Sequence, residues 1–302
     1  MRAGNDPFVD SHVHFWNLAR FDYEWLAGES DVLQQDRLPG HLRADVDQLD
    51  RLDLVGVVFV QADCRADQGM REVAWVHELA DAGAPVLAIV AHAPVEHGTD
   101  CAGKLAELAA TDLVTGVRRL LQDEPPGFAT SPQVIDGVRL LAMHGLSFDL
   151  CVRQHQIDEV TRLVAACPEV MFVLDHLGKP VISPDHFAAW AAALVRLAAL
   201  PNVRCKLSGL ASEAADDART TEALRPWLEH ALAVFGPDRC MVGSDWPVVT
   251  SVSTYGRWFE VVLEVLDELS AGDRTRVLTA TAEDTYDPLN RAARAKDPLP
   301  WL

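Results

Sequence analysis

Short apolar runs recur along the chain, separated by longer and more polar stretches. Most of these runs are continuous rather than alternating, which is typical of parallel strands buried on both faces. The pattern therefore predicts eight parallel strands, at residues 8–14, 55–61, 86–92, 115–121, 147–153, 171–178, 203–209 and 240–247.

The stretches between these runs carry helical patterns with recognisable ends. Ser131 followed by Pro132 predicts a helix start, because serine caps a helix and proline fits its first turn. An apolar stripe follows, and Gly145 ends the pattern. Residues 183–184 repeat the Ser-Pro start, and residues 220–236 form a third helical pattern that ends in glycine. Strands and helices thus alternate along the chain.

This alternation, in a chain of 302 residues, predicts an α/β protein with a single (β/α)8 barrel of the TIM type. We expect one domain over residues 1–302, because no linker, repeat or low-complexity segment divides the chain. An open doubly wound sheet is the alternative, but no Gly-x-Gly-x-x-Gly follows the first apolar run. Residues 16–45 are too long for a tight loop, and we expect them to fold over the top of the barrel.

The composition narrows the possible functions. The formal net charge of −19 disfavours binding to nucleic acids and to anionic membrane surfaces. The six cysteines contain no Cys-x-x-Cys pair, which suits a reducing compartment better than a disulfide framework. No apolar signal-peptide segment opens the sequence. We expect a cytoplasmic protein that acts on a small molecule, and whether it forms a homo-oligomer stays open.

The first apolar run contains two histidines two residues apart, His12 and His14. Residues with this spacing point to the same face of a strand. Two imidazoles on one face make half of a metal site. A pair of hydrogen-bonded core histidines is the alternative for an isolated His-x-His.

Ionisable side chains also gather at the carboxyl ends of later strands, where TIM barrels place their catalytic groups. They are Arg118, Arg119, Arg153, His155, Asp175, His176, Lys179 and Asp245. Because these strand ends meet on one face of a barrel, their joint placement indicates an active site.

Several segments resemble the amidohydrolase superfamily, and within it the branch that hydrolyses lactones (amidohydrolase family 2). They are "DSHVHFWNLARFDYEWL", "TGVRRLLQDEP", "FDLCVR", "DHLGKP" and "GSDWPV". The likeness spans the chain from about Phe8 to Leu289. The branch includes L-fuconolactonase, L-rhamnonolactonase, sulfomuconolactone hydrolase and pyrone-dicarboxylate lactonase. Two segments depart from it: "TATAEDTY" near the C-terminal end, and "AHAPVEH", which leaves the roles of His92 and His97 open.

The resemblance implies one divalent metal ion, zinc, as cofactor. Its ligands by resemblance are His12, His14, His176 and Asp245. Binuclear members of the superfamily use a lysine at the end of strand four, and "TGVRRLL" has none there. Some lactonases of this branch work without a metal, so the resemblance leaves occupancy open.

The resemblance also implies hydrolysis of a sugar-acid lactone of the L-fuconolactone or L-rhamnonolactone type, within sugar catabolism. Asp245 is the expected general base. His176 and Arg119 are expected to act on the lactone oxygens. Arg118 and Arg119 cannot both face inward on a regular strand, and the resemblance favours Arg119, although the sequence alone leaves the choice open. The expected substrate contacts are Trp25, Arg153, His155 and Trp246.

Three alternatives remain at this point. A metal-dependent decarboxylase of the neighbouring branch shares the same histidines and aspartate. A hydrolase of an aromatic-derived dicarboxylate lactone would use inward arginines to bind its anionic substrate. A non-catalytic, ligand-binding barrel is the third alternative, but it would be expected to lose Asp245 or the histidines, and all are present.

Overall fold

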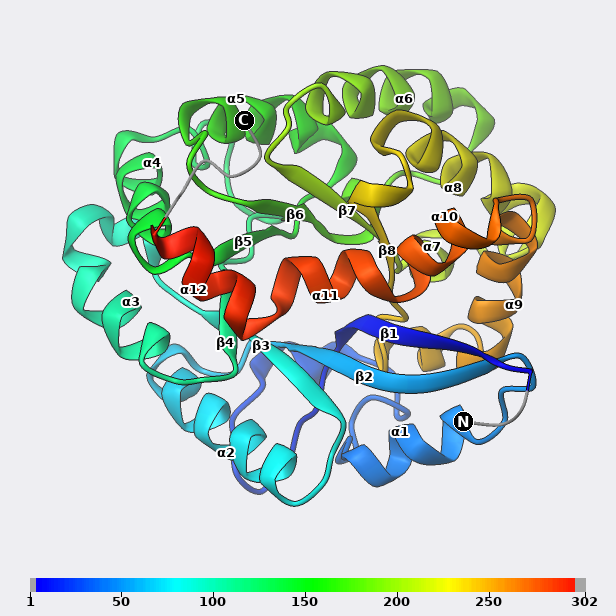
Figure 1. The fold of residues 1–302 in the computed structure, drawn as a ribbon, viewed down its shortest axis with the longest axis horizontal. Coiled ribbons are helices and arrows are strands. Elements are labelled where there is room, and N and C mark those ends of the chain that lie inside the picture. Colours follow the sequence, from blue (N-terminus) through cyan, green and yellow to red (C-terminus); the bar gives the residue numbers. More distant parts are fainter. Residues whose placement is uncertain (1–3, 297–302) are drawn as a thin grey trace.

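The computed structural model describes residues 4–296, which form a nearly closed barrel of eight parallel strands (Figure 1). Neighbouring strands pair in chain order, so the predicted TIM-type barrel is confirmed. The strands are β1 (Asp6–Val13), β2 (Leu52–Val60), β3 (Val86–His92), β4 (Val114–Arg118), β5 (Ser147–Leu150), β6 (Phe172–Leu174), β7 (Val203–Leu207) and β8 (Cys240–Val242).

Helices follow the strands and surround the barrel. They are α1 (Pro39–Val46), α2 (Gly69–Asp81), α3 (Ala102–Ala109), α4 (Pro132–Arg139), α5 (Ile157–Ala166), α6 (Pro184–Ala198), α7 (Leu210–Glu213), α8 (Thr221–Phe235), α9 (Tyr255–Leu266), α10 (Ala271–Thr275), α11 (Thr281–Tyr286) and α12 (Pro288–Lys296). Ser131 caps α4 as predicted, since its hydroxyl accepts a hydrogen bond from the Val134 amide at 3.4 Å. Among residues 4–296, no helix combines the length and the apolar character needed to cross a bilayer.

The two ends of the barrel differ in chemistry. At the amino-terminal end of the strands, the interior is a small apolar cluster that includes Val9, Val58, Val90 and Met241. Helix α11 adds Ala282 and Tyr286 to this cluster, and Figure 1 shows α11 and α12 lying across this end. The barrel is therefore sealed on one side, which leaves the carboxyl ends of the strands for the site.

The seam between the first and last strands closes just beyond β8. The amide of Asp245 donates to the carbonyl of His12 at 3.0 Å, and the amide of His14 donates to the carbonyl of Trp246 at 2.7 Å. These two backbone bonds hold the end of β1 against the segment that follows β8. They also fix the relative positions of the side chains on both segments.

The long segment 16–45 folds over the top of the barrel, as predicted. Trp16 and Arg37 exchange two backbone hydrogen bonds of 2.9 Å, which close this segment into a loop. Within it, Trp25 lies in a short 3-10 helix (Glu24–Gly28), and its indole Nε1 donates to the carbonyl of Ala62 at 2.8 Å. The loop is thus fastened to the end of β2, beside the carboxyl ends of the strands.

Candidate active site

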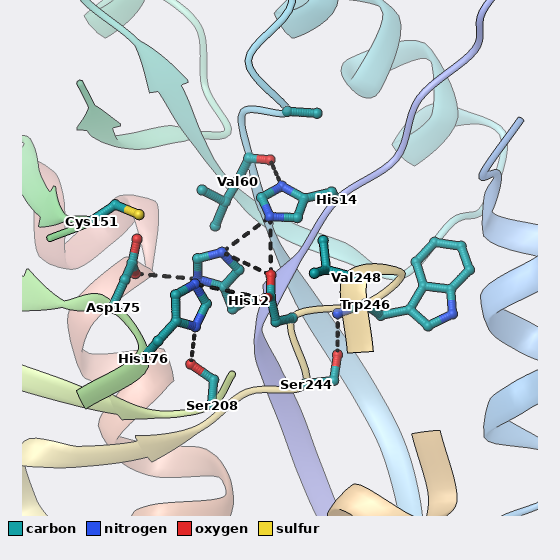
Figure 2. A network of polar contacts seen from close by, with 12 residues as sticks. His12, His14, Val60, Cys151, Asp175, His176, Ser208, Ser244, Trp246 and Val248 are labelled. Atoms are coloured by element: carbon teal, nitrogen blue, oxygen red, sulfur yellow. Dashed lines mark hydrogen bonds and ion pairs between the residues drawn. The ribbon is translucent and has the colours of Figure 1, made fainter. Parts of the chain in front are cut away.

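The two histidines of the first strand point toward each other at the carboxyl end of the barrel (Figure 2). The Nε2 atoms of His12 and His14 are 3.2 Å apart, and both side chains are buried. Their common direction follows from the two-residue period of a strand. This contact alone would also fit a pair of hydrogen-bonded core histidines, so the groups around the pair decide between the two interpretations.

Asp245 and His176 complete the cluster. Asp245 Oδ1 lies 3.3 Å from His14 Nε2 and 3.7 Å from His12 Nε2, and Asp245 Oδ2 lies 3.9 Å from His176 Nε2. One ligand atom each from His12, His176 and Asp245 lie within 4.8 Å of one another. His14 adjoins two of these three residues. The four side chains predicted from the sequence therefore meet in one place.

The outer ring nitrogens of His14 and His176 each contact an oxygen atom, and that of His12 lies near both Asp175 and the Lys206 Nζ, which is 3.3 Å away. His14 Nδ1 donates to the carbonyl of Val60 at 2.7 Å, His12 Nδ1 lies 3.2 Å from Asp175 Oδ1, and His176 Nδ1 lies 2.8 Å from Ser208 Oγ. Metal-binding histidines are oriented in this way by outer partners, which leave Nε2 free to bind. The donor set of nitrogen and carboxylate atoms fits a divalent ion such as zinc.

His176 is positioned by a left-handed backbone conformation and by a glycine, Gly209, that packs against its ring. It begins a left-handed stretch after β6, with φ of 53°. Gly209 lies against its ring, and a Cβ atom there would come within 2.5 Å of His176 Nδ1. Gly209 itself has φ of +70°, so both its conformation and the close approach favour glycine.

Burial and the neighbouring charges set the protonation states of the cluster. Burial opposes ionisation of Asp245, but the nearby His176, His14 and His12 hold its pKa below the ordinary range. Burial lowers the pKa of His176 to about 4, and burial together with Lys206 lowers that of His12. At neutral pH the carboxylate of Asp245 is therefore ionised, and the imidazoles of His12 and His176 are neutral.

A buried charge network supports the cluster from inside the barrel. Lys206 on β7 faces the interior, where its Nζ donates to Asp149 Oδ2 at 2.6 Å and lies 3.0 Å from Asp175 Oδ1. Tyr286 of α11 donates to the same Asp149 oxygen at 2.7 Å. Burial disfavours the Lys206 ammonium, but Asp149 and Asp175 hold its pKa above the ordinary value. The lysine is thus committed to ion pairs rather than to bridging two metal ions.

The expected orientation of the two strand-four arginines is wrong. Arg118 is the inward residue, with Nη1 3.3 Å from both Asp175 Oδ2 and His12 Nε2. Arg119 points away and pairs with Glu96 at 2.8 Å and with Glu124 at 2.5 Å. Strand residues do alternate, as expected, but the register of β4 on β3 turns Arg118 toward the axis.

A cavity of about 430 Å³ opens above the cluster. It is lined by His14, Trp25, Glu29, Leu33, Ala62, Asp63, Arg118, Leu120, Gln122, Asp123, Cys151, Arg153, His176, Lys179, Asp245 and Val248. A larger groove of about 660 Å³ runs between α1 and the start of β2, away from this chemistry. The smaller cavity is the candidate active site, because only it contains the convergent titratable groups.

The predicted substrate contacts divide into two groups. Trp25 and Arg153 line the cavity, and Arg153 also pairs with Asp123 at 3.2 Å. His155 is exposed and does not line it. Trp246 is fully buried, donates to Asp45 Oδ2 at 2.8 Å, and points away from the histidines in Figure 2. Neither His155 nor Trp246 therefore lies where a substrate in the cavity would touch it.

Other cavity residues carried no signal in the sequence. Glu29 comes from the covering loop, Asp63 from the turn after β2, and Gln122 from the turn after β4. Gln122 lies within the quoted segment "TGVRRLLQDEP", but the sequence predicts no role for it, and Glu29 and Asp63 lie outside the quoted segments. The two histidines whose roles were left open, His92 and His97, lie outside the cavity lining.

Comparisons with known proteins agree with this geometry. The amidohydrolase family profile matches residues 9–287. An L-fucono-1,5-lactonase from Burkholderia multivorans is 34% identical over 299 residues, which cover 92% of this chain and 95% of that protein. An L-rhamnono-gamma-lactonase from Scheffersomyces stipitis is 25% identical, over 89% and 94% of the two chains. A crystal structure of a Burkholderia multivorans amidohydrolase with bound zinc is 35% identical, covers 92% and 98% of the two chains, and superposes with a TM-score of 0.81.

Proposed function

Because this chain belongs to the amidohydrolase family and is a lactone-hydrolysing enzyme of that family, we propose that its substrate is a sugar-acid lactone of the L-fuconolactone or L-rhamnonolactone type. The observation that carries the proposal is the buried, ionised Asp245 among three imidazoles at the floor of the cavity. Lactones of this class arise by oxidation of an aldose, so the reaction would belong to sugar catabolism.

In the proposed reaction, Asp245 acts as the general base. Its carboxylate accepts a proton from the attacking water as the new carbon–oxygen bond forms. Arg118, the guanidinium that reaches the same floor, stabilises the negative charge that develops on the carbonyl oxygen. Since the pKa of His176 is about 4, its imidazole is neutral and hydrogen-bonds rather than donating an extra proton. The proton on Asp245 then passes to the ring oxygen as the ring opens.

We also propose one zinc ion at this site, held by His12, His176 and Asp245 with His14 beside them. When bound, such an ion polarises the lactone carbonyl and lowers the pKa of water. Arg118 Nη1 lies 3.3 Å from the same His12 nitrogen that would bind the ion. The guanidinium and the ion would therefore compete for that lone pair.

The charges of the cavity support a neutral, hydroxylated substrate over a dicarboxylate. Arg118 and Arg153, the two arginines of the lining, are each paired with an aspartate. Two carboxylates of the lining, Glu29 and Asp63, are able to accept hydrogen bonds from sugar hydroxyls. A second anionic group on the substrate would meet these carboxylates, at an electrostatic cost.

The test combines a substrate panel with Asp245→Asn. Wild-type enzyme should release acid, without carbon dioxide, from aldonolactones faster than from aromatic-derived dicarboxylate lactones. Asparagine cannot accept the proton, so kcat should fall by about 10²–10⁴-fold or more while the thermal midpoint stays close to wild type. Asp238→Asn, which removes an exposed carboxylate, is the matched control and should retain activity. Near wild-type kcat in folded Asp245→Asn would remove this residue from the chemistry, and a preference for dicarboxylates would refute the substrate.

A further inference from the structure

The segment after β6 is a left-handed turn of four consecutive residues. His176, Leu177, Gly178 and Lys179 have φ of 53°, 55°, 74° and 46°. Only one of them is glycine, so three residues adopt a backbone that side chains disfavour. Such conformations persist where the surrounding structure holds them, most often at functional sites.

The fold holds this turn at several points. The amide of Lys179 donates to the carbonyl of His176 at 2.8 Å, which closes the turn. The indole of Trp190 donates to the carbonyl of Leu177 at 2.9 Å from below, and the Leu177 side chain is fully buried in the core. The turn is thus built into the protein rather than left as a mobile loop connection.

The consequence of this turn is that two side chains are presented together. In a helix with three residues per turn, residues three apart lie on the same side. His176 and Lys179 have this spacing, and both line the cavity, whereas Leu177 between them does not. The left-handed turn therefore places the Lys179 side chain in the cavity together with His176.

Lys179 has no acidic partner of its own. Among residues 4–296, it forms no ion pair with a carboxylate, and its side-chain hydrogen bond goes to the neutral Gln122 Oε1 at 2.6 Å. An ammonium has three donors, so further donors remain for a ligand. By contrast, Arg118, Arg153 and Lys206 are each paired with aspartate. Among the cations that line the cavity, Lys179 is therefore the one without a paired carboxylate.

The depth of Lys179 indicates which anion it meets. His176, Arg118 and Asp245 are buried at the floor, with 3%, 4% and 7% of their surface exposed, whereas Lys179 is partly buried and Arg153 is exposed at the rim. In a lactone whose carbonyl reaches the floor, the ring oxygen is bonded to the carbonyl carbon and lies within the cavity that Lys179 also lines.

Resting on the proposed lactonase activity, we propose that Lys179 is a further catalytic residue whose ammonium stabilises the ring oxygen as the acyl–oxygen bond breaks. The oxygen of water forms its bond to the carbonyl carbon, and the bond from that carbon to the ring oxygen breaks. The electron pair of the broken bond goes to the ring oxygen beside Lys179. The proton that Asp245 took from water ends on this oxygen, and Lys179 keeps its own proton throughout.

The protonation state of Lys179 agrees with this role. Burial disfavours its ammonium form, but Cys151 and, after it, the carboxylates of Glu213 and Asp245 hold its pKa above the ordinary value. The group is therefore a permanent cation at neutral pH and acts through its charge. The alternative, that Lys179 binds a carboxylate on the substrate, makes a different prediction in the same experiment.

The experiment compares two neutral lactones that differ in their leaving oxygen, and it includes an aromatic-derived dicarboxylate lactone to test for carboxylate binding. An aldonolactone releases an alcohol, whereas dihydrocoumarin releases a phenol, whose pKa of about 10 makes it a far better leaving group. Lys179→Met should lower kcat on the aldonolactone by about 10²–10³-fold, the usual loss for one oxyanion donor. On dihydrocoumarin the loss should be less than about tenfold, and KM should change little on either lactone. Lys179→Arg should recover part of the loss, and Lys104→Met, which removes a half-buried lysine outside the cavity, is the matched control.

A second readout uses the aldonolactone alone. If Lys179 assists ring opening, its loss slows cleavage of the acyl–oxygen bond, and this step limits the rate more strongly than in wild type. The kinetic isotope effect of ¹⁸O at the ring oxygen should therefore be larger in Lys179→Met. Equal losses on both lactones with an unchanged isotope effect would overturn the proposal, as would a change confined to lactones that carry a carboxylate. Inactivity of wild-type enzyme on every lactone would instead refute the proposed function, so the two failures can be told apart.

Discussion

Replacing Glu72 with glutamine should change how the stability of the protein depends on pH. Glu72 lies on α2, is 1% exposed, and accepts hydrogen bonds of 3.3 Å from the Tyr23 hydroxyl and the Ala62 amide. It thus ties the covering loop to the end of β2. Burial raises its pKa from 4.5 to about 7, and the two hydrogen bonds only partly oppose this.

The direction and size of the effect follow from this shift. The folded protein holds the Glu72 proton more tightly than the unfolded chain, so this stabilising contribution is complete below about pH 4.5 and is lost as the pH rises to about 7. Each pKa unit corresponds to about 1.4 kcal/mol, so the full loss is about 3 kcal/mol, of which about 2 kcal/mol falls between pH 5.5 and pH 8.5. Glutamine resembles the protonated acid and has no proton to lose.

The assay is thermal unfolding of both proteins between about pH 5.5 and pH 8.5. The thermal midpoint of Glu72→Gln minus that of wild type should rise by about 4 °C from pH 5.5 to pH 8.5. This follows from roughly 2 °C per kcal/mol for a chain of this size. The raised pKa values of Asp10 and Asp149 affect both proteins alike and cancel in the difference. Glu78→Gln, an exposed change on the same helix, should show no such trend. A difference in midpoint that stays flat with pH would refute the reasoning.

Two further predictions concern the site. Arg118→Ala should lower kcat/KM by about 10²-fold or more, because it removes the inward guanidinium. Arg119→Ala should keep most of the activity. If steady-state kinetics gave the larger loss for Arg119→Ala, the orientation of β4 would be contradicted. Elemental analysis should find at most about one zinc ion per chain, and two zinc ions per chain would contradict a mononuclear site. A chelator should lower the thermal midpoint of the metal-bound protein, since a ligand that binds only the folded state stabilises it.

Much of the fold could be predicted because parallel strands leave a strong signal. Most residues of the eight strands are buried, and so most of the strands appear as nearly continuous apolar runs. The clustering of the candidate site could be predicted for a related reason: His12, His14, His176 and Asp245 end such runs, and a barrel brings strand ends together. Here the sequence position of a residue nearly determines its place in space.

The remaining site residues depend on local geometry that the sequence does not reveal. Asp245 has φ of 62°, and beyond it the chain turns so that Trp246 points outward, although it is the next residue. The choice between Arg118 and Arg119 depends on the register of β4, which an apolar run leaves undetermined by one residue. In the turn that presents Lys179, Gly178 alone hints at a left-handed backbone. Cavity residues on loops, such as Asp63, show no periodicity at all.

The seam between β1 and the segment after β8 has a consequence for how the enzyme comes into being. His12 lies near one end of the chain and Asp245 near the other, yet two backbone bonds at the seam set their side chains together. During synthesis His12 and His14 are made early. Asp245 is made only after the residues of the seven preceding strands. No partial chain therefore carries the complete site. The complete site therefore requires the closed barrel, and local opening of the seam would separate the histidines from Asp245.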